Sequence, residues 1–313
     1  MSSLPVDRAD DLPYGPGNPD YEYEARRDEK DAATESAEDY RADKDGPSLS
    51  SGIAHILISR SALHAWHAHP RLNPNYRESE SEEFDYGTAA HSLLLERDES
   101  RIVPIDANDW RTKAAKEARD AARAEGKTPM LARRLARVRE MVSAARAAIA
   151  SSELAGVLDG AEIEKSIRWQ EGKIVKCKAR PDAVNRDMQI IVDYKTTGCA
   201  EPDAFMRGGL AYGYDVQEAF YRRGMRALGM NYNFVFLAQE KEPPYACSLV
   251  ALDPAMQDMA DRKVDFAIAS WEACLKRNQW NGYANRIAYI APPAWYAAQN
   301  EILSDALENG VQA

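Results

Sequence analysis

The sequence predicts an α/β fold in which a mixed central β-sheet is flanked by helices. Five segments rich in β-branched and aromatic residues, at 161–170, 173–186, 188–196, 231–239 and 245–252, are typical of strands. Segments with helical spacing of apolar residues precede these strands, follow them, and separate the third strand from the fourth. Helices and strands in this order are expected to form layers around one sheet.

The helices are expected in two groups, and the first three strands in a meander. The first group lies at 50–68, 86–97, 108–125 and 129–150, with a polar loop at 69–83 and a helix break at 126–129. The second group lies at 213–228, after a Gly-Gly loop, and at 254–279 and 292–307. Three histidines before Pro70, namely His64, His67 and His69, are interpreted as a solvated helix end rather than a metal site.

The strongest chemical signal is a Pro-Asp pair and an Asp-x-Lys motif that are separated by ten residues. Asp193 and Lys195 interrupt an apolar strand and point to the same side of it, whereas Tyr194 points away. A hairpin can bring Asp182 beside Asp193. Two carboxylates and an ammonium group then converge, as a divalent cation and an attacking water need for phosphodiester hydrolysis. Alone, such short motifs also fit a turn and a surface ion pair, but charges within an apolar strand are costly unless compensated.

Two further segments carry short sequence patterns that accompany the Pro-Asp and Asp-x-Lys motifs. A Gly-x-x-x-His pattern at 87–91 ends at His91, and a Gln-x-x-x-Tyr pattern joins Gln217 to Tyr221. With the Asp182–Lys195 core, these resemble the PD-(D/E)XK nuclease superfamily, and within it the exonuclease VIII (RecE-like) and RecB-type branch of phages and prophages. Shorter similarities lie at 58–63, 111–113, 126–127 and 164–169, so the resemblance covers about 50–255. It implies a restriction-endonuclease-like core.

The resemblance implies a role for each residue of the core. His91, Asp182, Asp193 and the backbone carbonyl of Tyr194 would hold Mg²⁺ or Mn²⁺, and Lys195 would orient or deprotonate the attacking water. Without the resemblance, a lone histidine on an amphipathic helix is more often a packed or surface residue.

Four residues outside this core are also candidates. Gln217 and Tyr221 lie on one helical face, and the resemblance implies that Gln217 orients a phosphate or the lysine in catalysis while Tyr221 contacts DNA. The alternative is a surface glutamine above a half-buried tyrosine. Ser61, in the first matched segment, is a further DNA-binding candidate. Glu164 is either an additional carboxylate of the site or half of an exposed pair with Lys165.

One basic stripe is evident, just before the helix break. With about 100° per residue, one helical face carries Lys113, Lys116, Arg119, Arg123 and Lys127, together with Asp120. The stripe is either a phosphate-binding surface, with Arg111, Lys113, Lys116 and Lys127 as candidates, or an ordinary solvated face. No base-reading motif is present, so no sequence specificity is expected.

The net charge of −10 is unusual for a DNA-binding protein, but it is concentrated at one end. The first 45 residues hold 14 acidic and 6 basic residues, which leaves −2 for the rest of the chain. Residues 1–46 are therefore expected to be a disordered acidic tail, and 47–313 a single nuclease domain with helical N- and C-terminal parts. The tail is either a solvated leader or an acidic arm that competes with DNA or docks a partner. Its deletion is expected to preserve activity.

The resemblance implies an exodeoxyribonuclease that degrades linear double-stranded DNA from 5′ to 3′. The 3′ single strands would pass to a single-strand annealing protein in recombination. Two rivals are a structure- or end-specific endonuclease of the same superfamily and a non-catalytic DNA-binding protein on a decayed nuclease fold. The complete set of Asp182, Asp193, Lys195 and His91 argues against decay.

A ring-shaped homo-oligomer is also implied by the resemblance. Large aromatic residues near the C-terminus either pack between subunits or on their own sheet: Trp271, Trp280, Tyr289, Trp295 and Tyr296. The chain has no apolar run long enough for a membrane span and no signal-peptide pattern, so a cytoplasmic protein without membrane contact is expected. Its four cysteines lack CxxC spacing and are expected to be reduced, individually packed thiols.

Overall fold

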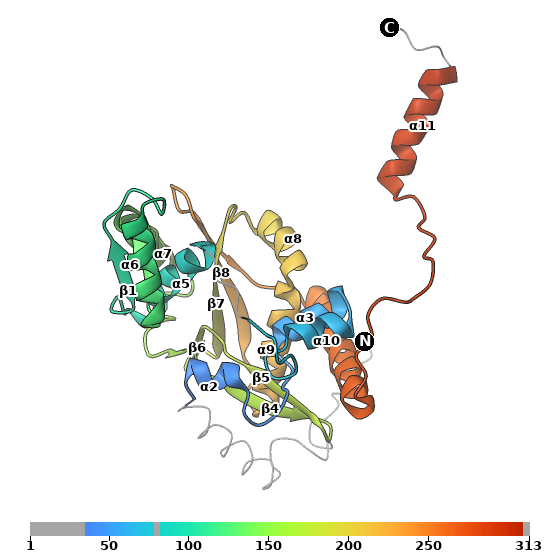
Figure 1. Ribbon diagram of the computed structural model, residues 1–313, viewed down its shortest axis with the longest axis horizontal. Helices are drawn as coiled ribbons and strands as arrows, with labels where there is room; N and C mark the ends of the chain where they lie inside the picture. The colour runs from blue at the N-terminus through green and yellow to red at the C-terminus, as the bar shows by residue number, and fades with distance from the viewer. Residues whose placement is uncertain (1–34, 78–81, 309–313) are drawn as a thin grey trace, which may run out of the picture. The chain divides into compact units, whose positions relative to one another are not determined.

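A five-stranded mixed sheet forms the centre of the chain (Figure 1). The computed structural model describes residues 35–77 and 82–308, which belong to two compact units divided after Asn281. The sheet lies in the first unit and has the order β3 (Glu162–Ile163), β6 (Ala183–Asn185), β7 (Ile190–Thr197), β8 (Asn233–Glu240) and β9 (Cys247–Val250). β7 and β8 are parallel, and the other neighbours are antiparallel. The predicted fold class is confirmed.

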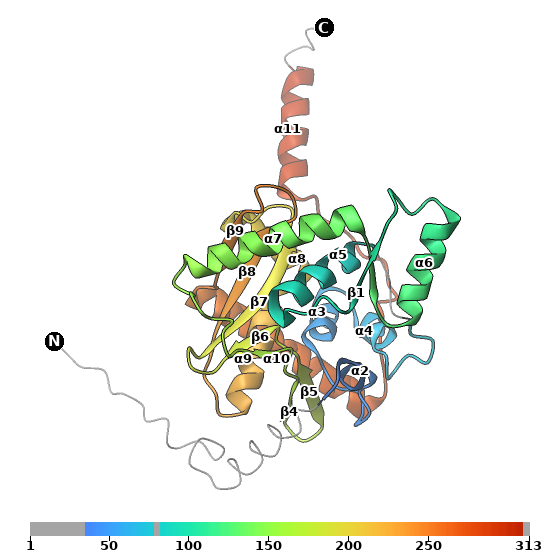
Figure 2. The ribbon, with the colours of Figure 1, turned by 90° about the vertical axis from the view of Figure 1, so that its left-hand side faces the viewer.

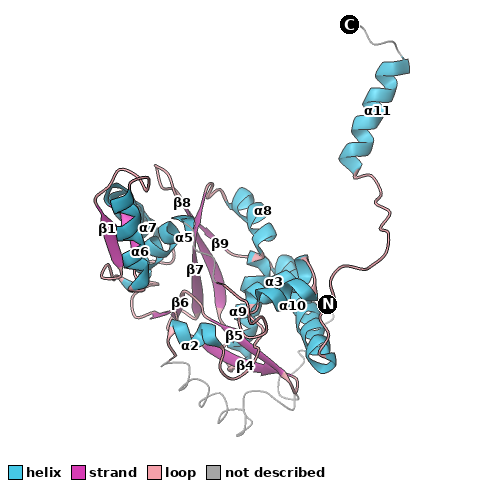
Figure 3. Cartoon of the chain, in the orientation of Figure 1, coloured by secondary structure: helices cyan, strands magenta, loops and turns pink. Residues whose placement is uncertain are grey.

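Helices cover both faces of this sheet (Figure 3). One face packs against α5 (Glu82–His91), the π-helical turn η2 (Ser92–Glu96) and α7 (Ala132–Ala150), in a core cluster that includes Val192 of β7. The other face packs against α3 (Ser51–Ser59), α8 (Pro202–Tyr212), α9 (Tyr214–Ala227) and α10 (Pro254–Arg277), in a cluster that includes Ile191. Figure 2 shows α7 lying across the sheet. Because β7 is buried on both faces, its charged residues lie between two apolar layers.

Two glycines shape the crossover from β7 to β8. Parallel neighbours require a long connection, and here it consists of α8 and α9 in succession. Gly213 joins these helices with φ of +78°, and a Cβ on it would lie 2.4 Å from the ring of His55. The predicted Gly-Gly loop is wrong, since Gly208 and Gly209 lie within α8. Packing requires a glycine at position 209, because a Cβ there would lie 2.4 Å from the ring of Tyr214.

The predicted three-strand meander contains five strands in two sheets. β4 (Ile167–Glu171) and β5 (Val175–Ala179) form a separate antiparallel pair, while β3, β6 and β7 belong to the central sheet. The chain leaves one sheet for the other at Glu164, which has a left-handed φ of +48°, and at Pro181, which has no backbone N–H to donate. Both breaks border the candidate site.

The helical region before the sheet differs from expectation in its boundaries. The helix predicted at 50–68 is two helices, because the chain breaks at Arg60 and Ser61 caps α4 (Ala62–Ala68). The sequence also missed a parallel pair, β1 (Ile102–Ile105) and β2 (Thr128–Leu131), which are joined through α6 (Lys113–Ala124). Strands of four residues give little periodic signal, and these two are separated in sequence by α6.

The end of the predicted disordered tail is folded. Residues 1–34 lie outside the described part of the chain, but α2 (Ala37–Ala42) follows a Ser36 cap and leads into a turn in which Asp43 is fully buried. The second unit contains α11 (Ala294–Glu308), which has no buried residue. None of the described helices is both long and apolar enough to cross a membrane.

Candidate active site

β7 carries two of the predicted catalytic residues to the edge of the core. Asp193 is fully buried and forms an ion pair with Lys195, whose side chain is 20% exposed. Gln217, one turn into α9, donates a hydrogen bond from Nε2 to Asp193 Oδ2 over 2.9 Å. The Lys195 ammonium lies 5.3 Å from the centre of the Tyr214 ring. The structure therefore brings Asp193, Lys195 and Gln217 together, with Gln217 bound to the carboxylate rather than to the lysine.

Asp182 lies beside β7, as a hairpin requires. It precedes β6, and its Oδ2 accepts a hydrogen bond of 2.8 Å from the backbone N–H of Tyr194. Its Oδ1 lies 3.2 Å from Nε2 of His91, at the end of α5. The Tyr194 ring points to the opposite face, where its hydroxyl donates to Gln239 Oε1 over 2.6 Å. The peptide of Tyr194 is thus held directly beside Asp182.

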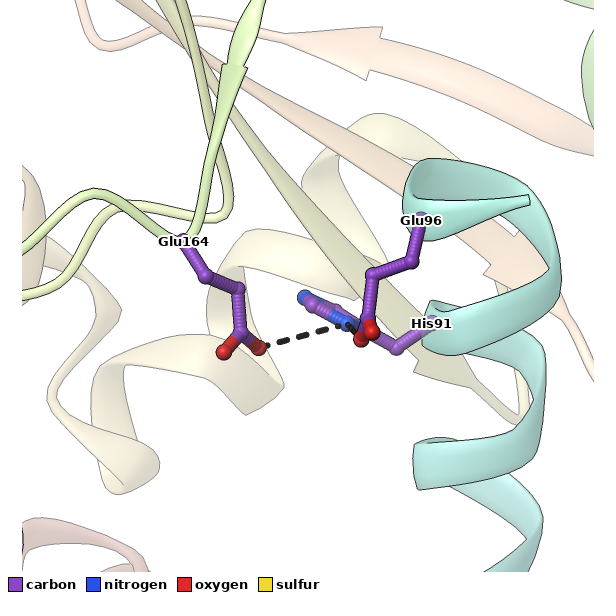
Figure 4. A group of neighbouring side chains, drawn as sticks. All are labelled: His91, Glu96 and Glu164. Carbon is purple, nitrogen blue, oxygen red and sulfur yellow. Dashed lines mark ion pairs between the residues drawn. The ribbon is translucent and has the colours of Figure 1, made fainter. Parts of the chain in front are cut away.

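Two further carboxylates approach the other nitrogen of His91 (Figure 4). Glu164 Oε1 lies 3.5 Å from Nδ1, and Glu96 Oε1 lies 3.9 Å from it. One donor atom from each of these three residues lies within 4.8 Å of the others, a spacing that suits a metal ion. Glu164 is further fixed by Arg180, which donates from Nε to Oε2 over 3.1 Å. Of the two readings of Glu164, the structure favours the site carboxylate over a pair with Lys165.

Glu96 was missed by the sequence analysis for a geometric reason. In a regular α-helix a residue five positions after His91 would point about 140° away from it. The wider turn η2 changes this angle and brings the carboxylate to the imidazole. No local pattern in the sequence distinguishes a π-helical turn from an α-helical one.

The site concentrates negative charge. Burial and the charge of Asp182 raise the pKa of Asp193 to about 7. Burial also acts to raise the pKa of Asp182, but the hydrogen bond and charge of His91 outweigh it and lower that pKa. For His91, burial lowers the pKa, yet Asp182, Glu164 and Glu96 together raise it above its usual value. Likewise, the pKa of Lys195 is raised by Asp193 and Asp182 against the effect of burial.

This donor set fits a hard divalent cation. Carboxylate oxygens with one imidazole are ligands that Mg²⁺ and Mn²⁺ accept. Burial and the charge of Asp182 disfavour ionisation of Asp193, and a bound cation would favour it. The expected ligands His91, Asp182 and Asp193 lie at this point, and Glu96 and Glu164 offer further oxygens.

The site opens into a cleft with about 1380 Å³ of empty space. Its walls combine the acidic residues with small and basic ones: Arg41, Gly87, Thr88, His91, Ser92, Glu96, Arg101, Thr128, Glu164, Asp182, Tyr194, Lys195, Thr196 and Tyr214. His91, Asp182 and Lys195 therefore face solvent in this cleft.

Two predicted DNA-binding residues have structural roles instead. Ser61 is 9% exposed and caps α4, with its Oγ accepting from the backbone N–H of His64. Tyr221 is 7% exposed, and its hydroxyl donates towards the backbone carbonyl of Arg180 over 3.5 Å. Direct contact with DNA would require exposed atoms, so the structure argues against this role for both residues.

The predicted basic stripe is exposed but paired with neighbouring acids. Lys113 and Arg111 side chains are 89% exposed, and they pair with Glu117 at 3.6 Å and Asp109 at 2.6 Å. Lys116 is exposed on the same helix. Lys127 is not on this helical face, because α6 ends at Ala124 and Gly126 turns the chain away with φ of +69°. The stripe is therefore shorter and less positive than the sequence predicts.

The sequence matches a known protein family over most of the domain that holds this site. Residues 59–293, more than half of the chain, match the family described as a PDDEXK-like domain of unknown function (DUF3799). The chain belongs to this PDDEXK-like family. The predicted PD-(D/E)XK family and fold are thereby confirmed. No curated protein matches the sequence.

Solved structures to which the chain is similar come from several bacteria. A candidate exonuclease from Eubacterium rectale aligns with a TM-score of 0.56 at 13% identity, over 83% of this chain and 96% of that one. An alkaline exonuclease from Laribacter hongkongensis aligns at 16% identity with a TM-score of 0.28, over 63% and 97% of the two chains. A phage-related exonuclease from Haemophilus somnus 129PT aligns at 14% identity with a TM-score of 0.26, over 61% of this chain and 95% of that one. At such identities, the similarity to the Eubacterium rectale structure is one of fold.

Proposed function

We propose that this protein is a metal-dependent exodeoxyribonuclease that hydrolyses phosphodiesters of linear double-stranded DNA. The observation that carries the proposal is the convergence of His91, Asp182 and Lys195 in one open cleft of a PDDEXK-like domain, with the buried Asp193 paired to Lys195. The resemblance to the exonuclease VIII branch supports 5′→3′ polarity, with 3′ single strands as the product for recombination. A cytoplasmic location is part of the same proposal.

Each residue of the cleft has a distinct part in this reaction. Mg²⁺ or Mn²⁺, held by His91, Asp182, Asp193 and the carbonyl of Tyr194, would polarise the scissile phosphate and lower the pKa of a bound water. Lys195 has a raised pKa and so carries its proton, which suits it to orienting the water and offsetting charge on the phosphorane rather than to removing a proton.

Gln217 acts through Asp193. Its hydrogen bond occupies Oδ2 and leaves Oδ1 beside Lys195, so the orientation of the carboxylate is fixed before substrate arrives. Such preorganisation matters because displacements of about 1 Å reduce rates strongly. Gln217 is therefore a positioning residue in this proposal, in place of a direct phosphate contact.

Circular DNA distinguishes this activity from that of an endonuclease of the same superfamily. The wild-type protein with Mg²⁺ is expected to degrade a linear plasmid and to leave the same plasmid intact when it is supercoiled and closed. Nicking or linearisation of the closed plasmid at a comparable rate would favour the endonuclease. Loss of neither form would favour a non-catalytic DNA-binding protein.

Self-association is proposed as well, together with handover of the product to an annealing protein. Trp271 is fully buried and packs against Trp280 within the first unit, so these two do not contribute. In the second unit Tyr289, Trp295 and Tyr296 are 92%, 68% and 51% exposed, which supports contacts with another subunit. Light scattering at micromolar concentration tests this, and a strictly monomeric mass with processive digestion retained would refute it.

A further inference from the structure

A short N-terminal segment forms part of the active-site cleft although it lies outside the matched family domain. We call residues 35–46 the strap. The family match begins at residue 59, yet Arg41 of the strap lines the same cleft as Asp182 and Lys195. We infer that the strap is a fixed wall of this cleft and that Arg41 binds a phosphate of the DNA backbone. This inference rests on the proposed function.

A buried carboxylate anchors the strap. Asp43 is fully buried, and it accepts hydrogen bonds from the backbone N–H of Ser48 over 2.6 Å and from its hydroxyl over 2.8 Å. Arg168 Nη1 lies 3.2 Å from Asp43 Oδ1, and Lys178 Nζ lies 3.5 Å from it. Charge-assisted contacts of this number fix a side chain firmly. Asp43 therefore holds the turn after α2 against β4 and β5.

An aromatic contact provides the second anchor. The ring of Tyr40 lies 4.7 Å from Lys178 Nζ and 5.9 Å from the guanidinium carbons of Arg168 and Arg180. Lys178 also donates to the backbone carbonyl of Tyr40 over 2.7 Å, and Arg168 pairs with Glu35. Figure 2 shows α2 beside this strand pair.

The cations that hold the strap are not available to bind DNA. Arg168, Lys178 and Arg180 would otherwise present a phosphate-binding patch, but they are engaged by Glu35, Tyr40 and Asp43. Lys178 is 5% exposed and unavailable to a polymer. The cluster therefore anchors the strap rather than binding DNA.

The position of Arg41 follows from the two anchors. Its neighbours at positions 40 and 43 are both held, so its backbone has little freedom, and its exposed side chain lies on the cleft wall. The wall also carries Glu96, Glu164 and Asp182, whose charges repel DNA, and two further cations, Arg101 and Lys195. A guanidinium on that wall offsets this repulsion and matches phosphate geometry. The charge and the fixed position together point to a phosphate contact.

The test is the salt dependence of DNA binding by the full-length protein. Ca²⁺ is used so that binding to a linear duplex is measured with little cleavage, while the KCl concentration is varied. For Arg41→Ala, Kd is expected to rise roughly fivefold at low salt, and the slope of log Kd against log salt to fall by about 0.9, the value for one lost phosphate contact. Arg41→Lys should restore the slope, since it keeps the charge.

Lys44→Ala is the matched control. Lys44 belongs to the same strap, is 73% exposed and pairs with Asp39, but it does not line the cleft. Its slope and Kd are expected to equal those of the wild type. Equal values for Arg41→Ala and Lys44→Ala would overturn the inference, and so would a lower slope in both.

Cleavage by the wild type in Mg²⁺ separates this inference from the proposed function. If the wild type cleaves linear duplex and Arg41→Ala binds with an unchanged slope, only the role of Arg41 fails. If the wild type does not cleave, the proposed function fails, and the inference falls with it.

Discussion

Replacing Asp193 by asparagine should stabilise the metal-free protein while it abolishes cleavage. Asp193 is fully buried, and its pKa is raised from 3.8 to about 7 by burial and by the charge of Asp182. A carboxyl whose pKa is raised in the folded state binds its proton more tightly there than in the unfolded chain. The wild type therefore loses stability as pH rises from about 4 to 7, and the whole cost is present above pH 7.

The size of the effect follows from the shift. At about 1.4 kcal/mol per pKa unit, ionised Asp193 lowers the free energy of unfolding by about 4 kcal/mol. Asparagine keeps the shape and removes the charge, but Lys195 then loses its nearest partner. The expected gain at pH 8 is accordingly between about 1 and 4 kcal/mol. Near pH 4 the two proteins should differ little.

Urea denaturation in EDTA, followed by circular dichroism at pH values from 4 to 8, measures this gain directly. The gap between Asp193→Asn and the wild type should open as pH rises. Adding Mg²⁺ at pH 8 should close it, because the cation stabilises only the ionised carboxylate strongly. A variant that is less stable than the wild type at pH 8, or a gap that does not change with pH, would refute the reasoning.

Three further predictions concern positioning, the strap and proton release. Gln217→Ala leaves Asp193 Oδ2 without its hydrogen-bond donor and should lower kcat roughly tenfold. The control Gln257→Ala removes a donor to Glu218 on α9 and should leave kcat unchanged. Steady-state digestion rates measure both. Removing the residues before the strap should leave stability and activity unchanged. Removing the strap as well leaves Arg168 and Lys178 without Asp43 and should lower the free energy of unfolding by roughly 3 kcal/mol, as urea denaturation would measure. Because Asp182, Glu164 and Glu96 raise the pKa of His91 against the effect of burial, its ring keeps a proton to higher pH in the metal-free protein than a free imidazole does. Mn²⁺ should therefore bind more weakly as pH falls and should release protons, as calorimetry in two buffers would report.

The centre of the site could be predicted because its signal is local. Asp193 and Lys195 interrupt an apolar strand at alternate positions. Because β7 is buried on both faces, charged residues in it are costly and therefore indicate a function. His91 and Asp182 were predicted by their resemblance to a known pattern, and the structure places them 3.2 Å apart. The mixed sheet followed from the order of strands and helices.

The remaining errors involve packing between distant segments. Tyr221 is buried and its hydroxyl donates towards the carbonyl of Arg180, and His69, interpreted as solvated, is 1% exposed, with its Nε2 bonded to the carbonyl of Ser48. The boundary of the acidic tail was placed too late, since a segment rich in Asp and Glu suggests disorder until Arg168 and Lys178 are seen around Asp43. In each case the deciding partner lies more than 20 positions away or on another element.

Digestion of an end-labelled linear duplex tests the central claim most directly. Wild-type protein and the folded Asp193→Asn variant are compared on DNA labelled at one 5′ end, with Mg²⁺ and with EDTA. The account predicts early release of the label by the wild type in Mg²⁺, and no release in EDTA or by the variant. Release by Asp193→Asn at the wild-type rate in Mg²⁺ would contradict the assignment of the catalytic site.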